Sequence, residues 1–78
     1  MTELKNYIQL EHIATSYPVT IALNSKECQL FASSDTKCYD LACQSVENRM
    51  QLNGDIQENE SLLENYFIEN IRIENEYY

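Results

Sequence analysis

The residue types that perform nucleophilic and metal chemistry are scarce in this sequence. It holds one histidine, His12, and three cysteines, Cys28, Cys38 and Cys43. Nucleophilic catalysis requires a serine or cysteine activated by an oriented base, and a reactive thiol usually has basic neighbours that lower its pKa. The sequence contains no cluster of lysines and arginines that would serve this purpose. We therefore expect an ordinary histidine and three cysteines that pack as small hydrophobic side chains.

These four residues equal a zinc ligand set in number, but their spacing argues against a zinc site. Cys38 and Cys43 stand five positions apart in a stretch that we predict to be helical. That spacing separates the two side chains by about 140° around the helix axis. Side chains this far apart on a regular helix neither bind one ion nor form a disulfide with each other. The sequence therefore predicts no metal site and no cofactor.

Paired carboxylates, which serve glycosidases and magnesium enzymes, are the remaining candidates for catalysis. Such sites need two or three carboxylates that converge in a cleft of about 300 Å³ or more, which a chain of this length rarely forms. Phosphate-binding loops of the Walker and Rossmann types are excluded because Gly54 is the only glycine. We therefore expect a protein that is not an enzyme.

Composition and charge limit the architecture and the partners. The 78 residues, of which 44% are hydrophobic and 23% charged, suit one small globular domain that spans residues 1–78. Five basic against thirteen acidic residues give a net charge of -8, so the surface should repel nucleic acid and anionic lipid. No apolar run reaches the ~20 residues of a membrane span, and no signal peptide is recognisable. With too few cysteines for a disulfide scaffold, the sequence favours the cytoplasm of a bacterial host cell.

The first third of the chain predicts a helix followed by a hairpin. We favour a helix over residues 3–15, although Ile8 to Glu11 alternate as a strand would. Pro18 ends that element because it has no amide hydrogen to donate. Two β-rich runs, 19–23 and 28–32, are separated by polar residues and indicate a β-hairpin.

The clearest helix is predicted over residues 35–52. Tyr39, Cys43, Val46 and Met50 recur at helical spacing, and we expect these side chains to be largely buried. Residues 33–35 offer side-chain oxygens that would cap the first turn.

A second helix is predicted to follow a sharp turn at Asn53 and Gly54, since these residue types tolerate left-handed backbone angles. Asp55 and Glu58 match a capping box and would begin this helix, which runs to Ile71. A final edge strand is expected near residues 70–77. The expected fold is therefore α+β, with an antiparallel hairpin or small sheet packed against two helices.

The last third of the chain, residues 54–78, concentrates the negative charge: seven acidic residues accompany one basic residue. On the predicted helix, Glu58 and Glu69 would flank the apolar face on one side, with Glu60 and Glu64 on the other. Glu60 and Glu64 are like charges at i, i+4, an arrangement that costs a few tenths of a kcal/mol. Such a broken local rule indicates a functional surface. The alternative is a solvated acidic face that aids solubility.

These observations favour a small non-enzymatic binding protein of bacterial or phage type. Its carboxylates would imitate a nucleic acid and occupy the basic nucleic-acid-binding surface of a partner, as expected of anti-CRISPR or anti-restriction inhibitors. The alternative is an antitoxin-type, immunity-type or subunit-type module that neutralises a basic protein. We expect no direct binding to nucleic acid or membrane. A homodimer would enlarge the marginal core, whereas tyrosine rings that complete a monomeric core are the alternative. The expected partner-binding residues are Glu58, Glu60, Glu64, Glu69, Glu74, Glu76, Tyr77 and Tyr78.

Overall fold

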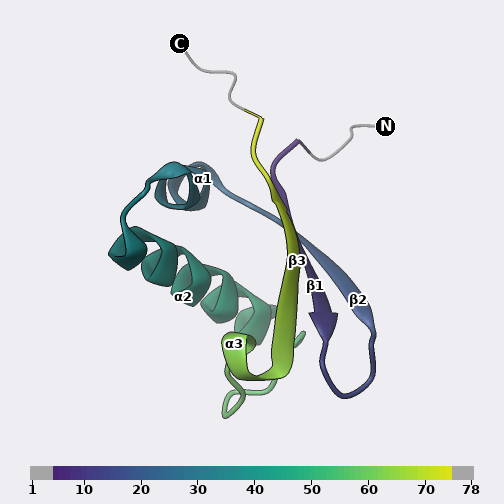
Figure 1. Cartoon of the computed structure of the whole chain (residues 1–78). Coiled ribbons are helices and arrows are strands. Elements are labelled where there is room, and N and C mark those ends of the chain that lie inside the picture. Colours follow the sequence, from purple (N-terminus) through teal and green to yellow (C-terminus); the bar gives the residue numbers. More distant parts are fainter. Residues whose placement is uncertain (1–4, 75–78) are drawn as a thin grey trace.

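The computed structural model describes residues 5–74 and shows a three-stranded antiparallel sheet with helices on one side (Figure 1). The strand order is β2-β1-β3, so both β2 and β3 are edge strands. This small α+β domain confirms the fold class that the sequence predicts. Its elements in chain order are β1 (Tyr7–His12), β2 (Pro18–Ala22), α1 (Ser25–Ala32), α2 (Thr36–Asn53), α3 (Leu62–Asn65) and β3 (Tyr66–Arg72).

Strand β1 replaces the predicted helix over residues 3–15, which is wrong wherever that range is described. Ile8 and Leu10 are fully or almost fully buried while Gln9 between them is exposed, the alternation of a strand with one covered face. β1 pairs with β2 through a hairpin loop in which Ser16 adopts a left-handed φ of 60° and donates its amide to the His12 carbonyl. In this segment, the alternation of apolar and polar residues is therefore a better guide to the structure than the helical spacing of its apolar residues.

Helix α1 occupies the position where the sequence predicts the second hairpin strand, and the prediction of a strand over 28–32 is wrong. Asn24 caps the helix, and a capping box is complete because the Glu27 carboxylate also accepts from the Asn24 amide. Cys28 is buried against the core. The polar segment interpreted as a hairpin turn is therefore the first turn of a helix. The first predicted strand, 19–23, corresponds to β2.

Helix α2 confirms the prediction over 35–52 with its ends displaced by one residue. Asp35 caps its N-terminus through the Lys37 amide, and Gly54 ends it in a left-handed conformation with φ 81°. Cys43, Val46 and Met50 are buried as expected. Tyr39 is not, since it remains 36% exposed and packs edge-to-face on Phe31 of α1.

The segment after α2 differs most from expectation, because the predicted helix from Asp55 to Ile71 is wrong. Residues 54–61 form turns anchored by buried Ile56, α3 is one short turn of helix, and β3 begins at Tyr66. The expected edge strand near 70–77 exists but begins earlier, and residues 75–77 lie outside the described part. β3 pairs along the whole of β1, with Glu69 as an extra residue in a β-bulge opposite Gln9 and Leu10.

The core lies between the sheet and α2. Its buried members come from β1, α1, α2, α3 and β3 and from the connections at Leu23 and Ile56, while β2 contributes only the half-buried Val19 and Ile21. The opposite face of the sheet carries Gln9, Thr20 and Phe67, all exposed. The buried core cluster consists of Ile8, Leu10, Leu23, Cys28, Val46, Met50, Ile56, Leu62 and Tyr66.

Candidate functional site

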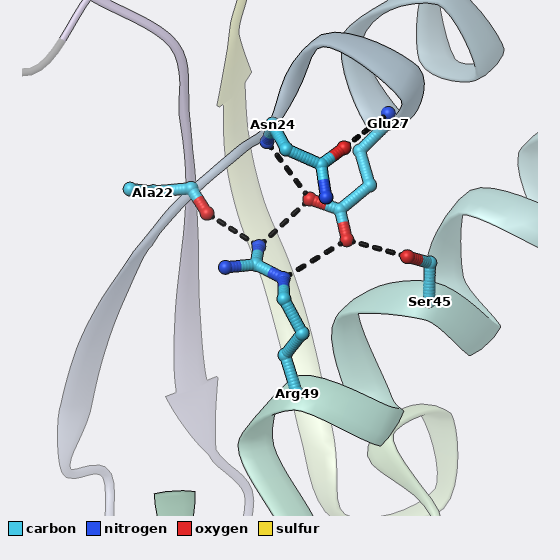
Figure 2. Close-up of polar contacts among 5 residues, drawn as sticks. All are labelled: Ala22, Asn24, Glu27, Ser45 and Arg49. Atoms are coloured by element: carbon cyan, nitrogen blue, oxygen red, sulfur yellow. Dashed lines mark hydrogen bonds and ion pairs between the residues drawn. The ribbon is translucent and has the colours of Figure 1, made fainter. Parts of the chain in front are cut away.

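A buried carboxylate lies where α1, α2 and the end of β2 meet (Figure 2). The Glu27 side chain has no solvent exposure. Its Oε1 accepts from the Asn24 amide at 3.0 Å and from Arg49 Nη2 at 2.7 Å. Its Oε2 accepts from Ser45 Oγ at 2.6 Å and from Arg49 Nε at 3.1 Å. Both oxygens therefore have two donors each, and the charge is paired in a forked geometry.

The buried pair of Glu27 and Arg49 holds structural elements together and is not placed to act on a substrate. Arg49 also donates to the Ala22 carbonyl, so its guanidinium connects α2 to both α1 and β2 (Figure 2). A carboxylate with four donors and no access to solvent has no oxygen left for a substrate. Sequence reasoning missed this pair, although the Asn24 and Glu27 spacing is that of a capping box. No local signal connects Glu27 with Arg49, because they are 22 residues apart.

Acidic residues outnumber basic ones on the rest of α2 and in the segment that follows it, where Lys37 is the basic neighbour of Asp40. Arg49 is the only basic residue between residues 38 and 71, a stretch that holds seven acidic residues. Since Arg49 is engaged by Glu27, it does not offset that charge. We use the name acidic surface for five acidic residues of α2, the turns that follow it and α3, namely Asp40, Glu47, Glu58, Glu60 and Glu64.

Two hollows beside α2 are lined by three of these carboxylates, Asp40, Glu47 and Glu58. One, of about 190 Å³, is lined by Asp40 and Glu47 together with residues 61–63 at the start of α3. The other, of about 400 Å³, lies over the C-terminal half of α2, where Glu58 faces Asn48 and Gln51. Gln51 donates to the carbonyls of Glu58 and Glu60 and so ties the turn segment to the helix. The acidic surface is therefore held in place by contacts with α2.

Apolar side chains accompany these carboxylates. Leu63 lines the first hollow and is 51% exposed, and Leu52 lines the second and is 86% exposed. Leu41, which is 59% exposed, lies eleven residues before Leu52 and thus on the same side of α2. These leucines add exposed apolar area beside the carboxylates.

Burial and nearby carboxylates raise the pKa values of two side chains, Cys43 and Tyr66. Burial raises the pKa of the Cys43 thiol, and the carboxylates of Asp40 and Glu47 raise it further. Burial likewise raises the pKa of Tyr66, with Glu60 and Asp55 adding to the effect. Cys43 is therefore a protonated thiol at neutral pH and a poor nucleophile.

Glu47 has a structural role as well as a charge. Its Oε1 accepts from the Leu62 amide at 2.7 Å, and Gln44 Nε2 donates to its Oε2 at 2.9 Å. Ser61, at the N-cap position of α3, forms no side-chain cap hydrogen bond within the described part of the chain. Glu47 therefore caps α3 from a neighbouring helix, which the sequence does not reveal.

The structure distributes the predicted partner-binding residues over three elements. Glu58 and Glu64 are exposed on the acidic surface, and Glu60 accepts from the Gln57 amide at 3.0 Å. Glu69 lies in the bulge of β3, so it does not share a helix face with Glu58. Because Glu60 precedes α3, its supposed i, i+4 repulsion with Glu64 on one helix is also wrong.

The remaining predicted residues lie at the end of the chain. Glu74 is 3.7 Å from Arg72, and its amide donates to the Asn6 side chain. Glu76, Tyr77 and Tyr78 lie outside the described residues. The acidic residues that sequence reasoning left out of the site, Asp40 and Glu47, precede the charge-rich last third and reach the surface through the packing of α3 on α2.

The residues considered for metal or nucleophilic chemistry are not brought together. His12 Nδ1 accepts from the Ala14 amide, and its ring packs edge-to-face on Tyr66 with centroids 4.9 Å apart. Cys28 and Cys43 are buried in the protein, and burial is the main cause of a raised pKa in both. Among residues 5–74, no group of three or more His, Cys, Asp or Glu side chains is placed to hold a metal ion.

Comparison of the chain with protein-family models, curated proteins and solved structures finds no match. In the described range, no helix has the length and apolar character needed to cross a membrane. The fold and the site together define a small α+β domain whose longest helix and the segment after it carry exposed carboxylates and leucines.

Proposed function

We propose that this chain is a non-enzymatic binding protein whose acidic surface occupies the nucleic-acid-binding face of a basic protein. The functional class is that of small anti-CRISPR or anti-restriction inhibitors of bacterial or phage type. The observation that supports it is the concentration of acidic side chains on α2, the turns after it and α3, which outnumber the nearby basic residues, together with the exposed leucines Leu52 and Leu63.

Carboxylates and leucines supply different parts of such an interaction. Carboxylates attract a groove lined with lysine and arginine and increase the association rate, while contributing less to final affinity. Exposed leucines supply apolar area that a protein surface can bury and that a sugar-phosphate backbone does not offer. The proposed partner is therefore a protein that has both a phosphate-binding face and an adjacent apolar contact area.

The partner is to be captured from a bacterial lysate at low salt, identified and purified for reconstitution. Binding is then measured for the double variant Glu58→Gln with Glu64→Gln, across a salt series. Two lost charges should weaken binding about tenfold or more and reduce the salt dependence. Glu11→Gln, a single charge change on the other face of the sheet, is the control and should alter affinity by less than about twofold.

The apolar contribution has its own matched pair of variants. Leu52→Ala should weaken binding without loss of stability, because this side chain is 86% exposed. Phe67→Ala removes an exposed side chain from the open face of the sheet and should leave the affinity unchanged. Equal effects of the two substitutions would contradict the assignment of the contact to the acidic surface.

Competition with a DNA or RNA duplex distinguishes the proposal from its alternative. If the partner is a nucleic-acid-binding protein, the duplex should displace this chain. A captured toxin that binds equally well in the presence of a duplex would instead support the antitoxin or immunity type. His12→Ala should leave inhibition within about twofold in either case, since no catalytic role is assigned to that side chain.

A further inference from the structure

The two edges of the sheet differ in how far they are protected from pairing with another strand. In an antiparallel ladder, residue pairs alternate between hydrogen-bonded and non-hydrogen-bonded positions. The Leu23 amide donates to the Asn6 carbonyl at 3.0 Å and so flanks the pair Tyr7 and Ala22. Ala22 is therefore in a non-hydrogen-bonded pair, and its backbone groups point away from β1.

The edge formed by β2 is closed at both ends. By the same alternation, the outward-facing residues of β2 are Pro18, Thr20 and Ala22. Pro18 has no amide to donate, and Arg49 donates to the Ala22 carbonyl. These are the devices that proteins use to stop edge-to-edge pairing.

The other edge of the sheet is β3, whose only strand neighbour among the described residues is β1 (Figure 1). The Ile13 amide donates to the Asn65 carbonyl at 2.9 Å, which flanks the pair His12 and Tyr66. Tyr66 and, two residues on, Ile68 therefore face outward. Beyond the bulge Ile71 faces outward too, because its partner Ile8 uses its backbone groups toward β2.

The bulge gives this edge an unusual spacing. The outward-facing residues are Tyr66, Ile68 and Ile71, and Ile73, which packs against the same core, follows two residues later. A regular strand presents its outward groups at every second residue and so matches only one side of the bulge. A second copy that runs antiparallel presents the same spacing in reverse, so the backbone groups of Ile68 and Ile71, on the two sides of the bulge, both find partners. The Tyr66 amide already donates to the Leu62 carbonyl, so the pairing is confined to the middle of the edge.

We propose that two copies of this chain pair through β3, antiparallel, with Ile68 of each opposite Ile71 of the other. The two-fold axis lies between Glu69 and Asn70, and the sheet becomes six-stranded. In this register half-buried side chains on the core side meet across the axis, so each copy extends the apolar contact of the other. The surface is distinct from the acidic surface, so dimerisation does not depend on the proposed function.

Charge predicts a distinctive dependence on salt. The two Glu69 side chains lie next to the axis, where like charges repel. Added salt should therefore strengthen the dimer, whereas it weakens binding between the acidic surface and a basic partner. Glu69→Gln should tighten dimerisation by about twofold to fivefold, and Glu64→Gln, away from the axis, should have little effect.

Amide exchange of the unmodified chain tests the edge directly. Protection of the Ile68 and Ile71 amides should appear at high protein concentration and be lost on dilution, in parallel with the dimer fraction from sedimentation velocity. The outward Thr20 and Ala22 amides on the other edge are the internal control and should exchange rapidly at every concentration.

A variant that keeps the fold tests the register. Phe67 is 57% exposed and would lie opposite Arg72 of the second copy, so Phe67→Lys places two cations together at both ends of the pairing. It should weaken the dimer at least tenfold, while Leu63→Lys, an equally exposed change off the edge, should not. A chain that stays monomeric up to millimolar concentration overturns the proposal, as does a dimer insensitive to Phe67→Lys. Protection of Ile68 and Ile71 that arises only with a different protein would assign the edge to a foreign strand and overturn it too.

Discussion

Carboxylates on two sides of helix α2 differ in their surroundings: one is buried and paired with an arginine, and the others are exposed to solvent. Toward α1, Glu27 is buried and each of its oxygens receives two hydrogen bonds, two of the four from Arg49. Toward α3 and the preceding turn, Asp40, Glu58 and Glu64 are exposed, and Lys37, three residues before Asp40, is the basic residue nearest to them in sequence apart from Arg49 and Arg72. The buried pair joins α1 to α2, and the exposed carboxylates create a negative electrostatic potential that would attract a basic partner. A count of charges in the sequence does not separate these roles, because one buried pair removes the basic residue that would have neutralised the surface.

The largest effect should come from breaking the buried pair. Arg49→Ala leaves Glu27 without a charge partner in the interior, which we expect to cost about 3 kcal/mol of unfolding free energy in urea titration. Arg49 is one-third exposed, so water reaching the site moderates the loss. The double variant Glu27→Leu with Arg49→Leu should recover most of it, because neither charge then remains buried. A loss below about 0.5 kcal/mol for Arg49→Ala would mean that the pair is dispensable.

A smaller effect on stability should come from Glu47, which is a carboxylate of the acidic surface and also caps α3. Glu47→Ala removes the acceptor of the Leu62 amide and should cost about 1 kcal/mol, the usual value of a helix cap. Glu47→Gln keeps an oxygen at that position and should cost less. Urea titration of the two variants separates the cap from the charge, since equal losses would show that the hydrogen bond contributes nothing.

Local signals explain which parts of the fold could be predicted from the sequence. Helix α2 was predictable because its cap Asp35, its left-handed Gly54 and its buried stripe all lie within one segment. Helix α1 was missed although its capping box is local, because β-rich residues follow Asn24. Strand β3 was not predictable as the partner of β1, because the ladder joins residues about sixty positions apart. Its apolar residues fit a helical wheel and a strand equally well, and tertiary pairing decides between them.

The candidate site was predictable in composition but not in geometry. Glu58 and Glu64 are exposed and Glu60 is half-buried, but their grouping as one partner-binding surface stays a prediction. The helix expected to align them does not exist, and Glu69 is removed from them by the β-bulge. Asp40 and Glu47 join the surface through the packing of α3 on α2. Long-range packing therefore decides which carboxylates are neighbours.

Alkaline pH should lower stability through two buried thiols, Cys28 of α1 and Cys43 of α2. Burial raises the pKa of both Cys28 and Cys43 in the folded protein, so each contribution to stability is fully present below the ordinary thiol pKa of about 8.5. It is lost as pH rises through the raised pKa, since the unfolded thiol ionises first. We expect the unfolding free energy to fall above that pH. Cys43→Ala should show a shallower fall than the unmodified chain, and an unchanged slope would mean that this thiol does not titrate on unfolding.

The smallest effect on stability, with the sharpest contrast to Arg49→Ala, should come from the exposed carboxylates. Replacing Glu58 and Glu64 together by glutamine removes two like charges from a chain of net charge -8, so stability should stay the same or rise by a few tenths of a kcal/mol. The gain should vanish in high salt, because the repulsion between exposed charges is then screened. Thermal unfolding at low and high salt measures it. A loss of stability above about 1 kcal/mol would mean that these carboxylates hold the turn segment in place, and the separation of a structural side and a binding side of α2 would fail.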